Sequence, residues 1–573
     1  MKSRTDRYTL SGRESKDPCG NRIERKVTGN TEMRFEKKEL LKPNIMVPFL
    51  TTLVVGLLVH FPVMVQNLPN ADAMTNFYFD QNMVTSGRWF LTIACGFSSY
   101  YDLKWLIGVL SILFLAIAAV LLVKVFDLRD YVAMGLTGAL LVSFPAVSAT
   151  FAYMYTADGY FMAFALSVLA VLLTKRYKKT GWLFGAVALC LSMGTYQAYL
   201  AATILLCLFD LILACIGNNK PKDTLMQGVR YLGMGVLGGI LYYVILKICL
   251  AVQGKELDTY QGINGMGKLS LSAFPGMVLD AYKDFAGFLR SGKIFILNGF
   301  SYAALILLFG IAFLAAIILM VRTGAIRKWY QVLMIVLFVI LIPLGCNVIL
   351  LISSEAFYHL LMRMQWGLFP VAAVVLTERM ITSRKNGKEA GKEEEKETEK
   401  AAEKETGYYG KLKIAAGLAA TFGALLLCWQ FFLSDQIAYF NMNERYEKTY
   451  AYCVRLADRI EQTPGYYTGM PVMMIGVLDP EKYPVTDITG GVTERIYGST
   501  GDMLIYKGEQ YKAFMEHYLN VSLNVITDDE KVVEIYNSDA YREMDSFPAA
   551  DSVKVVDGIL YVKTEPPEKK EAE

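Results

Sequence analysis

Hydrophobic residues along this chain fall into long, uninterrupted runs rather than the short alternating pattern of half-buried strands. About 20 consecutive apolar residues cross a bilayer as a helix, and by that measure eleven segments are candidate membrane spans. They lie near residues 44–66, 104–125, 130–149, 159–174, 180–195, 197–216, 228–252, 297–321, 329–352, 360–378 and 411–433. The pattern predicts a mostly α, polytopic helical membrane protein.

The connecting loops alternate in charge. Lys and Arg gather in residues 124–129, 175–179, 218–230, 322–328 and 380–413, whereas the short turns 150–158 and 194–199 contain neither. Basic loops stay on the cytoplasmic side of a membrane. We therefore expect a cytoplasmic basic tail at 1–43 and an extracytoplasmic segment at 434–573.

Two regions of the chain differ from the apolar runs. Within the transmembrane domain predicted for residues 44–433, residues 383–405 form a Lys/Glu-rich, low-complexity stretch that we interpret as a cytoplasmic linker. Residues 434–573 contain amphipathic helices, a strand-like apolar run and an alternating segment around Asp557–Gly558, which is typical of a β-hairpin. This tail is predicted to be a small extracytoplasmic α/β domain.

Composition supports the membrane interpretation and limits the chemistry. With 54% hydrophobic and 19% charged residues, the chain is too apolar for an ordinary soluble protein of this length. The net charge of +3 is distributed over loops and tails, so no nucleic-acid partner is expected. Three His and nine Cys show no metal-ligand spacing, and we expect no metal and no cofactor.

The loop between the first two spans carries the first candidate site residues, Asp72, Asp80 and Arg88. A helix beginning at Asp72 would align Asp72, Asn76 and Asp80 on one face. Its rise of about 12 Å would keep the two acids from sharing one proton, so only one of them can be the base. Capping of that helix is the structural alternative for Asp72, and anchoring to lipid headgroups is the alternative for Arg88.

Two turns add further candidates. Asp158 begins an otherwise uncharged span, where it either takes part in a site or caps the helix. Tyr196 and Gln197 place polar groups in an apolar hairpin turn, although this turn could also be a simple tight connection.

A third region contains Glu355, His359 and Arg363, which are spaced at i, i+4 and i+8. On a helix they would share one face, and such a stripe is costly to expose to lipid. We expect either a binding role or an internal ion pair.

Taken together, these segments resemble the Gtr type II glucosyltransferase family, the membrane enzymes that decorate bacterial O-antigen. The similarity covers roughly residues 45–440, and it rests on the order and spacing of Asp72, Gly87, Arg88, Trp89, Tyr155, Asp158, Met162, Tyr196, Gln197 and Ala198. Members often have a second acid directly after the first, whereas here Ala73 follows Asp72.

The resemblance implies a GT-C type glycosyltransferase of the bacterial cytoplasmic membrane. Such an enzyme would move a glucosyl group from a polyprenyl-phosphate sugar, a co-substrate rather than a cofactor, to a cell-surface glycopolymer on the outer face. Asp72 would be the base and Asp158 would orient the sugar or the base. The donor would be bound by Arg88, Arg363, Tyr196 and Gln197, with Asp80, Glu355 and His359 in support.

Membrane lipids, a companion flippase and a donor synthase are candidate partners under this interpretation. Two alternatives stay open at the level of sequence. The same charges could line the pathway of a transporter or lipid-linked sugar flippase, although no convincing similarity relates the two halves of the chain. A non-enzymatic receptor that binds through residues 434–573 is the other.

Overall fold

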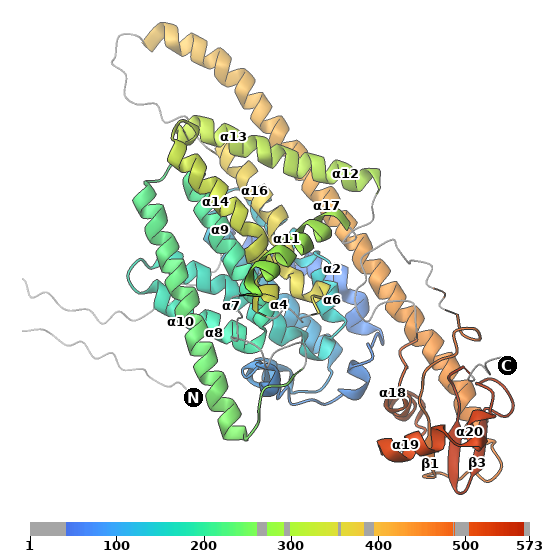
Figure 1. Ribbon diagram of the computed structural model, residues 1–573. Coiled ribbons are helices and arrows are strands. Elements are labelled where there is room, and N and C mark those ends of the chain that lie inside the picture. Colours follow the sequence, from blue (N-terminus) through green and yellow to red (C-terminus); the bar gives the residue numbers. More distant parts are fainter. Residues whose placement is uncertain are drawn as a thin grey trace, which may run out of the picture. The chain divides into compact units, whose positions relative to one another are not determined.

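We analysed a computed structural model that describes residues 42–259, 272–291, 298–352, 357–382, 395–484, 486 and 503–566 (Figure 1). The expected tail up to residue 41 and the first half of the Lys/Glu stretch lie outside these ranges. Residues Pro43–Glu573 form one compact unit.

The described part of this unit is mostly helical. Its helices before the C-terminal sheet are α2 (Pro43–Val65), α3 (Leu91–Cys95), α4 (Lys104–Phe126), α5 (Tyr131–Val142), α6 (Ala146–Phe151), α7 (Ala157–Arg176), α8 (Gly181–Thr195), α9 (Leu200–Ile216), α10 (Pro221–Gln253), α11 (Phe274–Ser291), α12 (Gly299–Leu305), α13 (Ile311–Thr323), α14 (Trp329–Cys346), α15 (Val348–Ile352), α16 (Leu368–Thr382) and α17 (Glu395–Glu461). Short 3-10 turns that matter below are η1 (Ala73–Thr75), η2 (Val84–Ser86), η3 (Gly96–Ser98), η4 (Met154–Thr156), η5 (Gln197–Tyr199) and η9 (Leu360–Gly367).

Within the described residues, 9 helical stretches are long and apolar enough to cross a membrane. Two shorter apolar helices, α5 and α8, lie within the expected segments 130–149 and 180–195, respectively. The chain thus has several membrane-capable helices, while eleven crossings and their orientation stay predictions.

Small residues let these helices approach closely, as is common between membrane helices. A side chain at Gly138 would lie 2.3 Å from the Thr52 hydroxyl of α2, and one at Gly108 would lie 2.6 Å from Met64. The helices α2, α4, α7, α8 and α10 pack in succession through such contacts.

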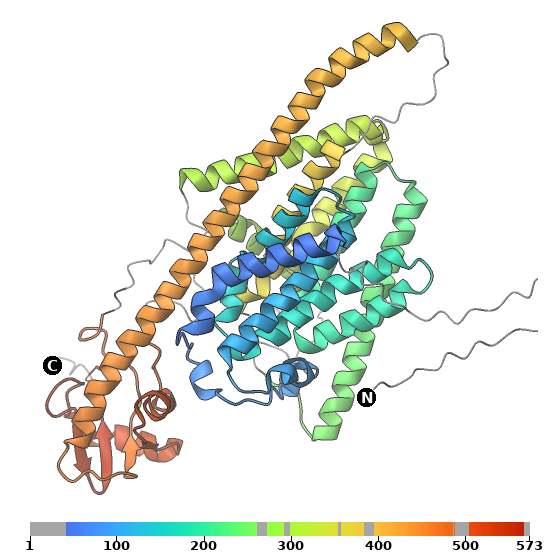
Figure 2. The ribbon, with the colours of Figure 1, turned by 180° about the vertical axis from the view of Figure 1, so that it is seen from behind.

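The helix α17 is continuous over 67 residues, from Glu395 to Glu461 (Figure 2). Residues 395–405 are already helical and continue into the expected span and amphipathic helix, so the predicted domain boundary at residue 434 falls inside α17. The division into domains stays a prediction. The helix is joined to α2 by a hydrogen bond of 2.6 Å between His60 Nδ1 and the Tyr439 hydroxyl. The other His60 nitrogen lies 2.8 Å from the Val142 carbonyl.

Beyond α17 the chain forms a small sheet with strands β1 (Pro471–Met473), β2 (Asn524–Val525), β3 (Val553–Val556) and β4 (Ile559–Val562). The strand order is β2-β1-β4-β3, with β1 parallel to both neighbours and β3 antiparallel to β4. The β3–β4 hairpin is present where expected, because Asp557 and Gly558 both adopt positive φ. Helices α18 (Gly508–Phe514), α19 (Asp529–Tyr536) and α20 (Asp539–Arg542) accompany this C-terminal sheet.

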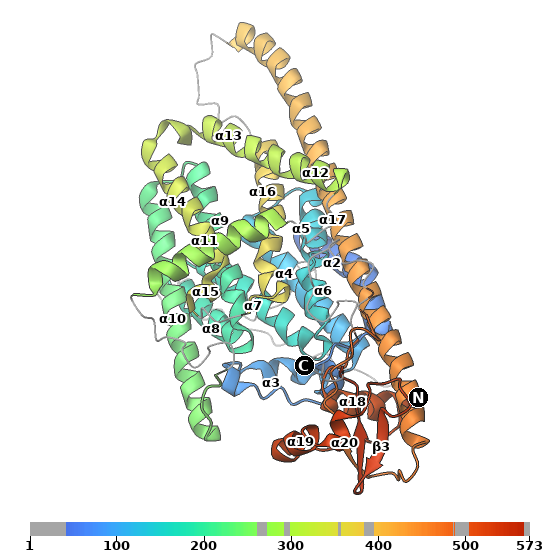
Figure 3. The ribbon, with the colours of Figure 1, turned by 45° about the vertical axis from the view of Figure 1, so that its right-hand side comes forward.

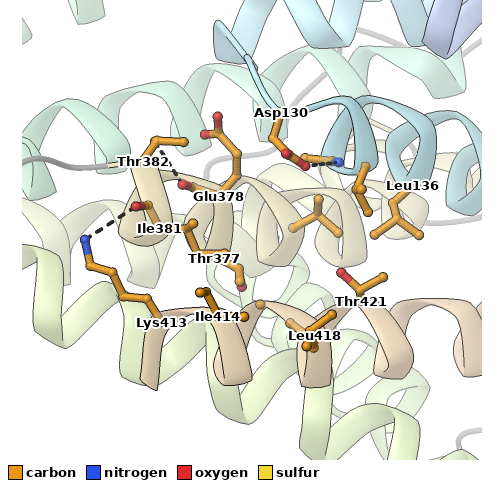
Figure 4. A pocket seen from close by; sticks show the side chains of 15 residues that line it. Asp130, Leu136, Thr377, Glu378, Ile381, Thr382, Lys413, Ile414, Leu418 and Thr421 are labelled. Carbon is orange, nitrogen blue, oxygen red and sulfur yellow. Dashed lines mark hydrogen bonds between the residues drawn. The ribbon is translucent and has the colours of Figure 1, made fainter. Parts of the chain in front are cut away.

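A cavity of about 300 Å³ lies between α5, α16 and α17 (Figure 4). Its carboxylates are engaged by backbone groups: Asp130 accepts from the Ala133 amide at 2.9 Å, and Glu378 accepts from the Arg129 amide at 3.2 Å. None of the candidate site residues that the structure describes lines this cavity.

Candidate functional site

The loop that follows α2 is mostly irregular, which corrects the predicted helix beginning at Asp72. Only η1 is helical here, so Asp72, Asn76 and Asp80 do not form a stripe. Asn70 rather than Asp72 provides the local cap, because its side-chain oxygen accepts from the Ala73 amide at 2.7 Å. The capping alternative for the Asp72 carboxylate is therefore wrong in this structure.

Asp72 is exposed, while its neighbours Ala73 and Met74 are buried. Partial desolvation by the surrounding protein raises the pKa of the Asp72 carboxyl, and the positive charge of Lys507 opposes that effect. An exposed carboxylate with a raised pKa suits a base that must accept a proton. Asp80 is also exposed, and its carboxylate accepts from the Asn82 amide at 3.0 Å.

Arg88 lies among aromatic side chains. It donates to the Tyr160 hydroxyl at 2.9 Å, and its guanidinium carbon lies 5.2 Å from the centre of the Tyr196 ring. Tyr160 and Tyr196 stack with ring centres 4.1 Å apart. The cation thus lies against two stacked rings supplied by α7 and the α8–α9 turn, rather than pointing out to headgroups.

Tyr155 of η4 packs against the loop that carries Asp72 and Arg88, with its ring centre 6.4 Å from that of Phe79. Its phenol interacts electrostatically with the Asp72 carboxylate, the Tyr160 phenol and the Arg88 guanidinium. Gln81 donates to the Tyr155 carbonyl at 2.8 Å, which attaches the loop to η4. A carboxylate and a cation are therefore both near one tyrosine.

Gln197 anchors the loop to the bundle. Its amide donates to the Ser86 carbonyl at 2.9 Å and to the Tyr242 hydroxyl at 3.1 Å. Tyr242, on α10, in turn donates to the Gly87 carbonyl at 3.1 Å. Gly87 has φ of +79°, and a side chain there would lie 2.4 Å from Gln197 and 2.6 Å from Tyr242, so only glycine fits.

Asp158 differs from Asp72 in being fully buried. One of its oxygens accepts from the Gly159 amide at 2.9 Å, at the start of α7. The carboxylate lies close to Cys95 and Ser98, near the place where α3 packs against α7. This placement favours a role in holding those elements together.

Arg363 forms a bidentate ion pair with Asp284 of α11, at 2.7 and 2.8 Å. Its guanidinium also lies 3.9 Å from the centre of the Tyr358 ring. The predicted helical stripe is wrong, because residues 357–359 are irregular and η9 is a 3-10 segment with non-helical φ and ψ at Arg363. His359 is half-buried beside Phe357, and Glu355 lies outside the described residues.

Arg363 and Gln197 lie on adjoining elements, because η9, which contains Arg363, packs against η5, which contains Gln197, and against α6. Tyr160, Tyr242 and Asp284 were absent from the sequence-based candidates. Tyr160 and Tyr242 lie in apolar runs that gave no sign of a polar role. Asp284 lies on α11, and only the ion pair shows that Arg363 is its partner.

Chemically, this arrangement offers an exposed carboxylate, a cation and several phenols near one loop. A carboxylate can take a hydroxyl proton, and an arginine can hold a phosphate. Among the residues that the structure describes, no group of three or more His, Cys, Asp or Glu side chains could hold a metal ion.

Comparison with known proteins adds a family assignment. The model of the family described as glucosyl transferase GtrII matches residues 61–371, which is more than half of the chain. The chain belongs to the GtrII glucosyl transferase family. The match includes Asp72, Arg88, the Tyr196–Gln197 turn and Arg363, and GtrII membership implies glucosyltransferase activity with a sugar donor and a glycan acceptor. No curated protein and no solved structure matches the chain.

Proposed function

We propose that this GtrII protein transfers a glucosyl group from a polyprenyl-phosphate sugar to a cell-surface glycopolymer. The reaction would take place on the outer face of the bacterial cytoplasmic membrane, with the N-terminus in the cytoplasm. The basic loops predicted to be cytoplasmic support this orientation, because they lie on the opposite connections from the Asp72 loop.

In the proposed step, the acceptor hydroxyl oxygen attacks the anomeric carbon of the donor. The bond from that carbon to the phosphate oxygen breaks, and polyprenyl phosphate leaves with the electron pair. Asp72 takes the hydroxyl proton as base, and inversion at the anomeric carbon follows from a single displacement. Arg88 stabilises the phosphate charge that develops on the leaving group.

The observation that carries this proposal is that the loop of Asp72 also supplies Arg88, which is held against Tyr160 and Tyr196 inside the bundle. The base must reach the acceptor hydroxyl while the cation reaches the donor phosphate, so both groups must lie in one site. The Asp72 loop supplies both groups. We assign the donor phosphate to Arg88 rather than Arg363, because the charge of Arg363 is already paired with Asp284. Tyr196 packs against Arg88, and Gln197 holds the loop through its hydrogen bonds to Ser86 and Tyr242.

The decisive experiment follows labelled polyprenyl-phosphate glucose in membranes that contain the protein and its native acceptor. Asp72→Asn should lower transfer by about 100-fold or more, since general-base catalysis contributes on that order. Asp280→Asn is the control, because Asp280 is an exposed acid of α11 with no assigned role in the site, and its transfer rate should stay normal. Full activity in Asp72→Asn at equal expression would overturn the assignment of the base, and label that crosses the membrane without transfer would indicate a flippase instead.

A further inference from the structure

The loop that carries Asp72 is held from two sides. The bundle holds its later part through Gln197 and Tyr242, as described above. Its first part, η1, packs instead against α18 of the C-terminal sheet region (Figure 3). The residues beside the proposed base are thus fixed by a segment more than 400 positions away in sequence.

Met74 joins the loop to the C-terminal region. Its side chain is fully buried and belongs to the hydrophobic core of that region, together with Tyr452 of α17 and Phe514 of α18. Burial of an apolar methionine side chain stabilises this contact. Met74 is only two residues from Asp72, so this contact restricts the backbone at the base.

Phe77 adds a second contact on the other side of η1. Its ring lies 4.4 Å from the centre of the His517 ring and 5.9 Å from that of Tyr518. Both partners lie in the π-helical turn Met515–Leu519 that continues α18. Two apolar side chains of the loop therefore pack against aromatic and apolar groups of α17, α18 and the turn that continues α18.

Lys507 contributes a charge at the same junction. It precedes α18, and its positive charge acts on the Asp72 carboxylate. The backbone at Lys507 is tightly packed, because a side chain at Gly476 would lie 2.6 Å from the Lys507 carbonyl carbon. The Gly508 amide donates to the Ile475 carbonyl at 3.1 Å, so the start of α18 is fixed to the segment after β1.

We infer that the C-terminal region is a functional part of the transferase site: Met74 and Phe77 are positioning residues that hold the Asp72 loop against α18. This inference rests on the proposed function, because it assigns the catalytic step to Asp72. It gives the segment from Lys507 to Leu519 a role in turnover in addition to any role in folding.

The test compares Phe77→Ala with Phe97→Ala, since Phe97 is an exposed phenylalanine of the same loop. In the full-length protein, Phe77→Ala should lower kcat for labelled polyprenyl-phosphate glucose by about tenfold, because small misplacements of a catalytic group are costly. The donor KM should stay unchanged, since the base acts only in the transition state. Phe97→Ala should behave as the wild type.

Hydrogen–deuterium exchange gives a readout that does not depend on activity. Amides of residues 72–77 should exchange faster in Phe77→Ala than in the wild type or in Phe97→Ala. Faster exchange with unchanged kcat would overturn the inference and leave the proposed function intact. A wild-type protein that transfers no sugar would overturn the proposed function itself, and the inference with it.

Discussion

Arg363 and Asp284 form a bidentate ion pair that fastens α11 to η9, with the Arg363 side chain only 8% exposed. Asn347 donates to the same carboxylate at 3.0 Å. Removing one member of a buried pair leaves the other charge without compensation. Asp284→Asn should therefore lower the free energy of unfolding by about 1–3 kcal/mol, measured by thermal unfolding in detergent.

The control for this substitution is Asp280→Asn. Asp280 lies one turn earlier on α11 and pairs with Lys283 at 3.4 Å, where both side chains are about two-thirds exposed. Exposed pairs contribute little, so its unfolding temperature should match that of the wild type. Equal unfolding temperatures for both variants would contradict a structural role of the Arg363–Asp284 pair.

Gly87 should be irreplaceable in the Asp72 loop. In Gly87→Ala, the left-handed backbone costs about 1–2 kcal/mol, and the new methyl group displaces Gln197 and Tyr242. Both lose hydrogen bonds that fix Ser86 and Gly87 beside Arg88. We expect at least a tenfold loss of transfer in the membrane assay, which corresponds to about 1.4 kcal/mol.

Gly235→Ala provides the comparison, because nothing lies within 4 Å of a side chain at that position of α10. It should express and transfer normally. If Gly87→Ala were also normal, the close packing of Gln197 and Tyr242 on the loop would have no bearing on activity.

The helical part of the fold follows from long apolar runs, which is why the expected segments coincide with α2, α4, α9 and α10. The C-terminal hairpin follows equally directly from its Asp557–Gly558 pair. These signals are local, and each depends on neighbouring residues only.

The candidate site depends on contacts between distant residues, which local sequence patterns cannot predict. Helical spacing predicted one polar stripe that includes Asp72 and another that includes Arg363. Neither segment forms an α-helix, since tertiary contacts with α18 and α11 override the local pattern. The ion pair between Arg363 and Asp284 spans 79 residues, and the burial of Met74 depends on partners near residues 452 and 514. One sequence gives no indication of which distant residues meet.

Replacement by asparagine should lower transfer much less at Asp158 than at Asp72. Asp158 is fully buried and bonds the Gly159 amide, and an asparagine oxygen can accept that bond as well. We expect Asp158→Asn to keep at least about a tenth of wild-type kcat, against the roughly 100-fold loss expected for Asp72→Asn. Asp158→Ala should instead lower the stability by about 1–2 kcal/mol through the lost bond. A stable but inactive Asp158→Asn would show that Asp158 touches the reacting atoms.

Tyr242 and Tyr243 offer a direct test of the link between α10 and the loop. The Tyr242 hydroxyl accepts from Gln197 and donates to the Gly87 carbonyl, whereas Tyr243 is 49% exposed on another face of α10. Tyr242→Phe removes both bonds with little change in volume, and each bond contributes about 1 kcal/mol. Transfer should fall about fivefold to tenfold in Tyr242→Phe and stay normal in Tyr243→Phe, measured as kcat/KM with labelled donor. Equal rates in the two variants would mean that the Gln197 amide alone suffices to hold the loop beside Arg88.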